Sequence, residues 1–139
     1  GSFLASRLTP LDRELAIDVN LAYVRRVLES LPPARTLVLT GFSQGATMAA
    51  RVAASFGSAA GLIMLAGDLP PEIHADPTLV LPPVLLARGN DDDWYTVEKL
   101  KKDLSYLEGK AGVTTCEFEG GHEWTDDFRE AAGKFLASL

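Results

Sequence analysis

Cysteine, histidine and positive charge are all scarce in this sequence. Its 139 residues include one cysteine, Cys116, and two histidines, and the net charge is −6. A single cysteine excludes an intrachain disulfide framework, so we expect Cys116 to be a small buried side chain in a strand. Without a CxxC, HExxH or histidine cluster, no metal site is expected. The acidic balance argues against nucleic acid or an anionic membrane surface as a partner.

Long hydrophobic runs and a leader pattern are also missing. The apolar stretches are far too short for a membrane span, and the first residues show no signal-peptide pattern. We therefore expect no membrane span and a cytoplasmic location. Hydrophobic residues still make up 47% of the chain, which predicts one globular domain over residues 1–139.

Apolar runs alternate with helical patterns along the chain. Strands are predicted at 36–41, 60–66, 83–88 and 113–118, and helices at 11–30, up to about 55, at 96–110 and from about 125. The inward faces of the last two helices are expected to hold Leu100, Leu104, Leu107, Phe128, Ala131, Ala132, Phe135 and Leu136. Unbroken apolar strands separated by helices are typical of a parallel sheet covered on both faces. The predicted fold class is therefore α/β, a mostly parallel sheet of about four strands flanked by helices on both faces.

A G-x-S-x-G motif lies between the first predicted strand and the next helix, at Gly41, Phe42, Ser43, Gln44 and Gly45. Strand, sharp turn and helix form the context in which such a serine is a nucleophile. We expect the turn to strain the backbone of the serine, and both flanking glycines to let strand and helix approach closely. The free N–H groups at the start of the helix suit an oxyanion.

Two other polar clusters follow predicted strands. Residues 88–93 close the third strand and include Asp91, Asp92 and Asp93, and residues 119–122 close the fourth strand and end in His122. Because the carboxyl ends of parallel strands meet at one edge of a sheet, a serine, a carboxylate and a histidine should gather there. Their order along the chain is Ser, Asp, His, which is the order found in α/β-hydrolases.

Each of the three groups has a chemical task. A serine hydroxyl is a poor nucleophile without an adjacent base, and histidine titrates near neutral pH. His122 is expected to take the proton of Ser43, while a buried carboxylate holds the imidazole and stabilises its charged form. The residues alone leave open which aspartate serves. The other histidine, His74, lies in the proline-rich stretch 67–83, which we expect to be a loop with His74 on its surface.

The chain resembles the phospholipase/carboxylesterase branch of the α/β-hydrolases, which includes acyl-protein thioesterases. The resemblance lies in residues 41–45, 89–95 and 120–123, and their spacing extends it over nearly the whole chain. It implies that Ser43 is the nucleophile, His122 the base and Asp92 the acid. It further implies that the backbone N–H of Gln44 is one oxyanion donor, and that neither a cofactor nor a metal takes part.

The chain departs from this family in one respect. Such hydrolases take a second oxyanion N–H from a loop after an earlier strand, usually marked His-Gly, and no His-Gly occurs here. One missing donor costs roughly 10²–10³ in rate. The chain is thus expected to correspond to the C-terminal part of the fold, as a truncated, partial or naturally reduced protein. Strand 36–41 would then be an exposed sheet edge, which predicts a homodimer through that edge.

The predicted function is hydrolysis of carboxylic esters or thioesters through an acyl-enzyme. Trp94, Tyr95 and Trp124 flank the acid and base loops; they either line an acyl pocket, with Trp94 and Trp124 as the substrate-binding candidates, or cover the end of the sheet. A second hypothesis is a weak or inactive hydrolase-like module that binds a ligand or partner. A third, a flavodoxin-like domain that binds a phosphorylated ligand, lacks the glycine-rich phosphate loop.

Overall fold

Four parallel strands form the sheet on which the chain is built. The computed structural model describes residues 10–32 and 36–139. The chain divides into two units, Gly1–Arg35 and Thr36–Leu139, and each is described by itself. In the first unit, helix α2 (Pro10–Ser30) confirms the helix predicted at 11–30.

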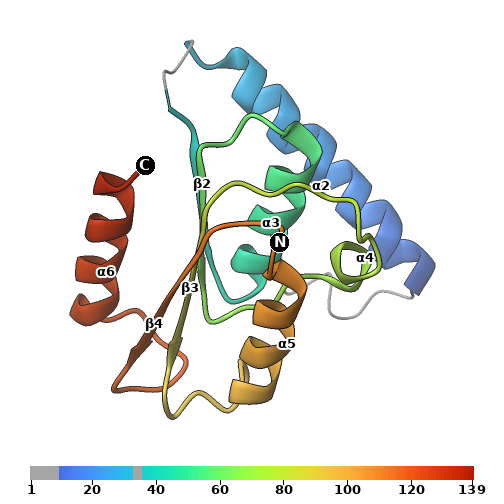
Figure 1. Ribbon diagram of the computed structural model, residues 1–139. Coiled ribbons are helices and arrows are strands. Elements are labelled where there is room, and N and C mark those ends of the chain that lie inside the picture. Colours follow the sequence, from blue (N-terminus) through green and yellow to red (C-terminus); the bar gives the residue numbers. More distant parts are fainter. Residues whose placement is uncertain (1–9, 33–35) are drawn as a thin grey trace. The chain divides into compact units, whose positions relative to one another are not determined.

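The sheet lies wholly in the second unit. Its strands are β1 (Val38–Phe42), β2 (Gly61–Leu65), β3 (Val84–Gly89) and β4 (Val113–Phe118), and they follow one another in the order β1-β2-β3-β4. All three neighbouring pairs are parallel, as Figure 1 shows. The α/β fold class and the parallel sheet predicted from the sequence are therefore confirmed.

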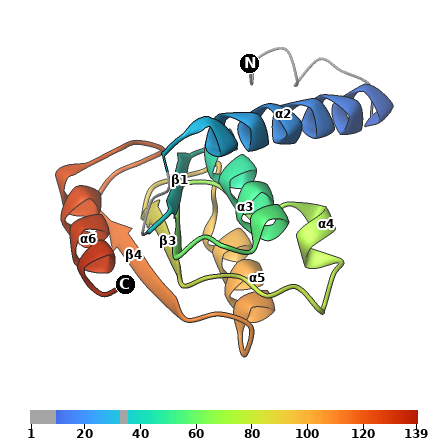
Figure 2. The same ribbon diagram turned by 90° about the horizontal axis from the view of Figure 1, so that it is seen from above.

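Helices cover the sheet on both faces. They are α3 (Gln44–Phe56), α4 (Pro71–His74), α5 (Val97–Leu107) and α6 (Asp126–Ala137). Figure 2 shows α3 and α5 on one face and α6 on the other. The sequence sets the ends of these helices: Thr96 and Thr125 accept N-terminal backbone N–H groups of α5 and α6. Gly57 ends α3 in a left-handed conformation with φ of 64°.

The two central strands are the centre of the core. Every residue of β2 and β3 is buried, as expected for strands covered on both faces. Leu100 and Leu107 of α5 and Phe128 and Phe135 of α6 are buried against them, as predicted, whereas Leu104 is only partly buried. The prediction for Leu136 is wrong: it is 47% exposed, because it lies beside rather than on the inner stripe of α6.

Two further predictions need correction or refinement. The stretch 67–83, predicted to be a loop, contains the short helix α4, which begins at Pro71 directly after Pro70. A proline at the first helical position has its φ preset for a helix. Cys116 lies in β4 as predicted, but it is only partly buried, because β4 is an edge strand.

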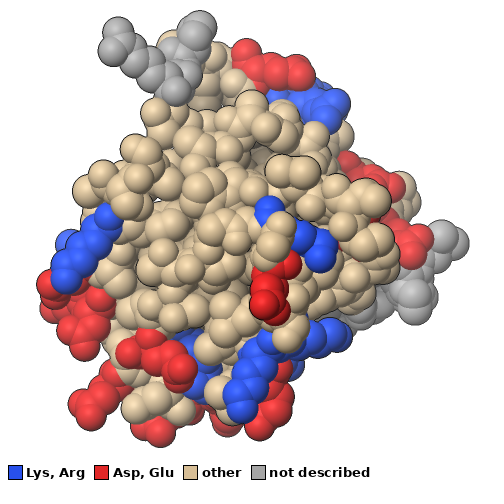
Figure 3. Space-filling view, viewed as in Figure 1, with Lys and Arg blue, Asp and Glu red and all other residues tan. Residues whose placement is uncertain are grey.

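Charged side chains lie on the outer helices. Figure 3 shows acidic and basic side chains next to one another over α5 and α6. Within α6, Lys134 pairs with Glu130 at 3.4 Å. Both side chains are well exposed, so this pair contributes little to stability.

Candidate active site

Ser43 lies at the carboxyl end of β1, in the turn before α3. Its backbone has φ of 58° and ψ of −122°, a conformation that a non-glycine residue adopts only when its surroundings enforce it. The Ser43 N–H donates to the Leu65 carbonyl of β2 at 2.8 Å. The strained turn predicted from the motif is therefore present, and it lifts the Ser43 hydroxyl out of the sheet.

Two glycines allow this turn, and one of them was not expected. A Cβ on Gly41 would lie 2.1 Å from the Gly45 carbonyl oxygen, and one on Gly67 would lie 2.1 Å from the Ser43 carbonyl oxygen. Gly41 is thus required for close approach, as predicted. The same expectation for Gly45 is wrong, because a Cβ there meets nothing within 4 Å. Gly67 follows β2, and no local sequence pattern links it to Ser43.

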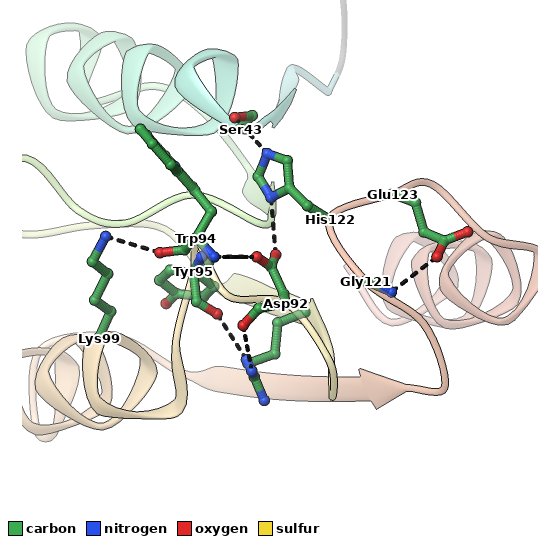
Figure 4. Close-up of polar contacts among 9 residues, drawn as sticks. Ser43, Asp92, Trp94, Tyr95, Lys99, Gly121, His122 and Glu123 are labelled. Carbon is green, nitrogen blue, oxygen red and sulfur yellow. Dashed lines mark hydrogen bonds and ion pairs between the residues drawn. The ribbon is translucent and has the colours of Figure 1, made fainter.

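His122 bridges Ser43 and Asp92, as Figure 4 shows. Its Nε2 lies 2.8 Å from the Ser43 Oγ, and its Nδ1 lies 2.9 Å from the Asp92 Oδ2. A carboxylate only accepts, so Nδ1 carries the hydrogen and Nε2 is free to accept from the serine hydroxyl. The three side chains come from the ends of three strands, β1, β3 and β4, and they form one continuous hydrogen-bonded array.

Asp92 is buried and fully hydrogen-bonded, whereas Asp91 and Asp93 are exposed. The Asp92 Oδ1 accepts the backbone N–H groups of Trp94 at 2.8 Å and Tyr95 at 3.0 Å. Burial by itself would raise the pKa of Asp92, but the hydrogen bonds from His122 and from the two N–H groups outweigh it, and the pKa is lowered. Asp92 is therefore held as a carboxylate beside His122.

The loops that carry Asp92 and His122 are bound to one another. The Asp91 N–H donates to the Gly120 carbonyl at 2.8 Å, and the Gly120 N–H donates to the Asn90 Oδ1 at 3.2 Å. A Cβ on Gly89 would lie 2.3 Å from the carbonyl oxygens of both Gly120 and Gly121. The distance between the two loops thus depends on the lack of a side chain at Gly89.

The Arg88 side chain supports the loop that carries Asp92, a role that was not predicted from the sequence. Its side chain is buried, and it donates to the Tyr95 carbonyl from Nε at 2.9 Å and to the Asp92 carbonyl from Nη2 at 3.2 Å. Nη1 pairs with Glu117 of β4 at 2.8 Å. One guanidinium therefore fixes both ends of the turn 92–95. An arginine at the end of an otherwise apolar strand was the available signal.

The aromatic candidates occupy different places. Trp94 is 54% exposed and its ring lies 6.3 Å from the His122 ring. Phe42, which the sequence did not single out for this role, lies 5.0 Å from the same ring. Trp124 is also exposed but packs edge-on against Phe128 at 4.8 Å. Tyr95 is 1% exposed, so it belongs to the core and not to a pocket wall.

His74 is the clearest error of the sequence prediction. Its side chain is only 15% exposed, and its Nε2 lies 2.7 Å from the Oδ1 of the buried Asp103. The surrounding proline-rich sequence indicated a surface loop, but α4 turns the ring toward α5. No local pattern connects the two residues, which are 29 positions apart.

The start of α3 offers hydrogen-bond donors beside Ser43. Gln44 is the first residue of this helix, and the first N–H groups of a helix have no carbonyl partner one turn earlier. The positive end of the helix dipole points the same way. Gln44 directly follows Ser43 in the chain, and its role as an oxyanion donor stays a prediction.

Residues 10–32 and 36–139 hold neither a cluster of candidate metal ligands nor a helix that could span a membrane. In this part of the chain, no group of three or more His, Cys, Asp or Glu side chains is arranged to hold a metal ion. Among the described helices, none has both the length and the apolar character that crossing a bilayer requires.

The sequence matches a known family of hydrolases. The family model described as serine hydrolase (FSH1) matches residues 9–124, so the chain belongs to this serine hydrolase family. No curated protein sequence matches the chain significantly.

Solved structures of esterases share the fold. Acyl-protein thioesterase 2 of Zea mays superposes with a TM-score of 0.70 at 21% identity, covering 88% of this chain and 64% of that one. The Bacillus cereus carboxylesterase superposes with a TM-score of 0.67 at 19% identity, and the match covers 92% of this chain and 60% of that one. Esterase PE8 superposes with a TM-score of 0.70 at 28% identity, and the match covers 91% of this chain and 61% of that one. The fold is that of the α/β-hydrolases, and the chain spans less than two thirds of the length of each of these proteins.

Proposed function

We propose that this chain hydrolyses carboxylic esters or thioesters through an acyl-enzyme formed on Ser43. One observation carries the proposal: the His122 ring lies within hydrogen-bond distance of both the Ser43 hydroxyl and the buried Asp92 carboxylate. Membership in a serine hydrolase family and the fold shared with esterases and a thioesterase support it. Ser43 is the proposed nucleophile, His122 the general base and Asp92 the acid.

In the proposed reaction the Ser43 Oγ attacks the substrate carbonyl while its proton passes to the His122 Nε2. The new C–O bond pushes an electron pair onto the carbonyl oxygen, and the Gln44 N–H stabilises that oxyanion. The imidazolium gives the proton to the oxygen or sulfur of the departing alkoxide or thiolate, which leaves as the alcohol or thiol while the carbonyl re-forms. Water, deprotonated by His122, then attacks the acyl-Ser43 ester, and the imidazolium returns that proton to the Ser43 Oγ as the carboxylic acid leaves. Asp92 stays ionised throughout, consistent with its lowered pKa.

Exposed aromatic rings surround the proposed base, and they indicate an apolar substrate. Trp94 and Phe42 lie 6.3 Å and 5.0 Å from the His122 ring. We propose that Trp94 binds the apolar part of the ester, with Phe42 beside it, and that Trp124 is a second substrate contact. If so, Trp94→Ala should raise KM for longer acyl chains more than for acetyl esters, and Trp124→Ala should do so less.

A fluorophosphonate probe followed by intact-mass measurement tests the nucleophile. A single adduct is expected on the wild type and none on Ser43→Ala. If it forms, p-nitrophenyl esters of increasing chain length and an acyl thioester should then be hydrolysed by the wild type alone. No adduct on a protein whose far-UV spectrum and cooperative melting show that it is folded would contradict the proposal. It would favour instead a hydrolase-like module that binds a ligand or partner.

The open edge of β1 is the proposed site of homodimer formation. Among the described strands β1 pairs only with β2, so one row of its N–H and C=O groups faces away from the sheet. An unpaired strand edge is a template for a second copy. Light scattering at increasing concentration should give a dimer mass, and a monomer at the highest concentration would contradict this proposal.

A further inference from the structure

A second buried carboxylate lies behind the proposed triad. Asp103 of α5 is 1% exposed, and it accepts three hydrogen bonds from three different segments. The Tyr95 hydroxyl donates to its Oδ2 at 2.7 Å and the Leu69 backbone N–H donates to the same oxygen at 3.3 Å. The His74 Nε2 lies 2.7 Å from its Oδ1. Within the described chain, this one carboxylate joins the segment after β2, the end of α4 and the segment after β3.

One of these contacts leads to the proposed acid. Tyr95 holds Asp92 through its backbone, because its N–H donates to the Asp92 Oδ1 at 3.0 Å. The same residue is fixed at the other end, where its hydroxyl reaches Asp103. Its ring is buried between these two ends. A shift of the Tyr95 hydroxyl would therefore move one of the two N–H groups that orient Asp92.

A second contact leads to the proposed nucleophile. Leu69 lies two residues after Gly67, whose Cα packs so closely on the Ser43 carbonyl that a Cβ would lie 2.1 Å from that oxygen. Between them, the Asp68 carbonyl accepts the Thr47 hydroxyl of α3 at 2.8 Å. The segment that Asp103 holds at Leu69 thus supports the turn of Ser43 from behind.

Burying the Asp103 carboxylate lowers the free energy of unfolding. Burial raises the pKa of Asp103, and the hydrogen bonds from Tyr95, His74 and Leu69 only partly oppose this rise. An apolar side chain at this one position would leave three donors without a partner, but apolar side chains at Asp103 and its partner side chains together would fill the space without that cost. A role beyond packing is therefore the simplest reason for a buried acid that binds two loops of the site.

We propose that Asp103 is a positioning residue that binds the Asp92 loop to the loop behind Ser43 and so fixes the separation that His122 spans. The expected effect of Asp103 on kcat rests on the proposed esterase function. Its expected effect on the positions of Asp92 and Ser43 does not. Asp103 touches no reacting atom; it acts through Tyr95 and Leu69.

Tyr95→Phe is the sharpest test, because it keeps the buried ring and removes only the bond to Asp103. We expect kcat for a p-nitrophenyl ester to fall about tenfold with little change in KM, since misplaced groups lose transition-state stabilisation without losing substrate binding. Asp103→Asn keeps one acceptor oxygen and should have a smaller effect in the same direction. Asp103→Asn is the replacement test if the Tyr95→Phe variant does not fold.

Tyr106→Phe is the matched control. Tyr106 lies on the same helix as Asp103, and its hydroxyl donates to the Asp76 carbonyl at 2.5 Å. Its ring packs edge-on against His74 at 5.2 Å, and the substitution keeps that ring. The substitution removes the same hydroxyl, here from a partly buried hydrogen bond to a neutral carbonyl. It should lower the melting temperature by less than Tyr95→Phe does and leave kcat unchanged.

The His122 Nδ1 proton gives a readout that does not depend on activity. Its hydrogen bond to Asp92 should produce a far-downfield proton NMR signal, and the hydrogen bond of His74 to Asp103 should produce a second. The chain has only two histidines, so His122→Gln and His74→Gln assign both signals. We expect Tyr95→Phe and Asp103→Asn to shift or broaden the His122 signal, and Tyr106→Phe to leave it in place.

The outcomes separate the two proposals. If Tyr95→Phe matches Tyr106→Phe in kcat and in the His122 signal, Asp103 is only a structural residue and the positioning role is refuted. If the wild type forms no probe adduct, the esterase proposal fails. In that case the His122 signal in Tyr95→Phe still decides whether Asp103 positions the array.

Discussion

Replacing Gly89 with alanine should separate the loops of Asp92 and His122. The added Cβ would lie 2.3 Å from the carbonyl oxygens of Gly120 and Gly121, whereas 3.4 Å is the beginning of ordinary contact. The 120–122 loop must therefore retreat by about 1 Å, and both obstacles are backbone atoms that cannot rotate away. The His122 bonds to Ser43 and Asp92, at 2.8 Å and 2.9 Å, cannot both survive such a shift.

The expected effect is large on reactivity and moderate on stability. A displacement of this size at a reacting group costs about 10²-fold in rate, and the overpacking costs about 1–3 kcal/mol of unfolding free energy. The rate of fluorophosphonate labelling at Ser43 measures the loss of reactivity, and urea unfolding measures the loss of unfolding free energy. Reduced labelling of a variant that still unfolds cooperatively is the predicted result.

Gly112→Ala is the control for this substitution. Gly112 precedes β4 at the opposite end of the sheet, its carbonyl pairs with the Val84 N–H at 2.9 Å, and a Cβ there meets nothing within 4 Å. It should label at the wild-type rate. Wild-type labelling of Gly89→Ala with unchanged stability would refute the reasoning, because it would mean that the two loops accommodate the Cβ without cost and without displacing His122.

Two further predictions concern Asp92 and a third concerns Gly133 in α6. Asp92→Asn should lower kcat about 10⁴-fold with little change in fold, because the amide favours the wrong tautomer of His122; unchanged kcat would exclude Asp92 as the acid. The lowered pKa of Asp92 means that its contribution to stability is complete above its ordinary pKa of 3.8 and lost as pH falls through the lower folded value. The stability difference between wild type and Asp92→Asn in urea should therefore shrink only below about pH 3.8, and a loss near neutral pH would contradict this assignment. Gly133→Ala, in the interior of α6 with nothing within 4 Å of its Cβ, should raise the unfolding free energy by about 1 kcal/mol, and a lower melting temperature would contradict the local geometry.

The sequence by itself determined the layers of the fold and the three side chains of the array. Apolar runs without alternation predicted strands buried on both faces, because a residue pattern of this kind has no exposed face to present to water. The strand-turn-helix context predicted the strained conformation at Ser43, and the parallel sheet placed the aspartates at 91–93 and His122 at the same edge. The choice of Asp92 among them came from the family resemblance. These inferences rest on periodicity and on residue types, which are properties of neighbouring positions in the chain.

Only the tertiary structure decided what supports that array. Three contacts join segments that lie in or follow different strands: the close approach of Gly67 to Ser43, the pairing of Arg88 with Glu117 of β4, and the pairing of His74 with Asp103. His74 was expected on the surface and Tyr95 was left between a pocket and the sheet end, because burial depends on which elements fold over a residue. Contacts between distant positions leave no trace in local pattern, so they became visible only once the sheet had brought its strand ends together.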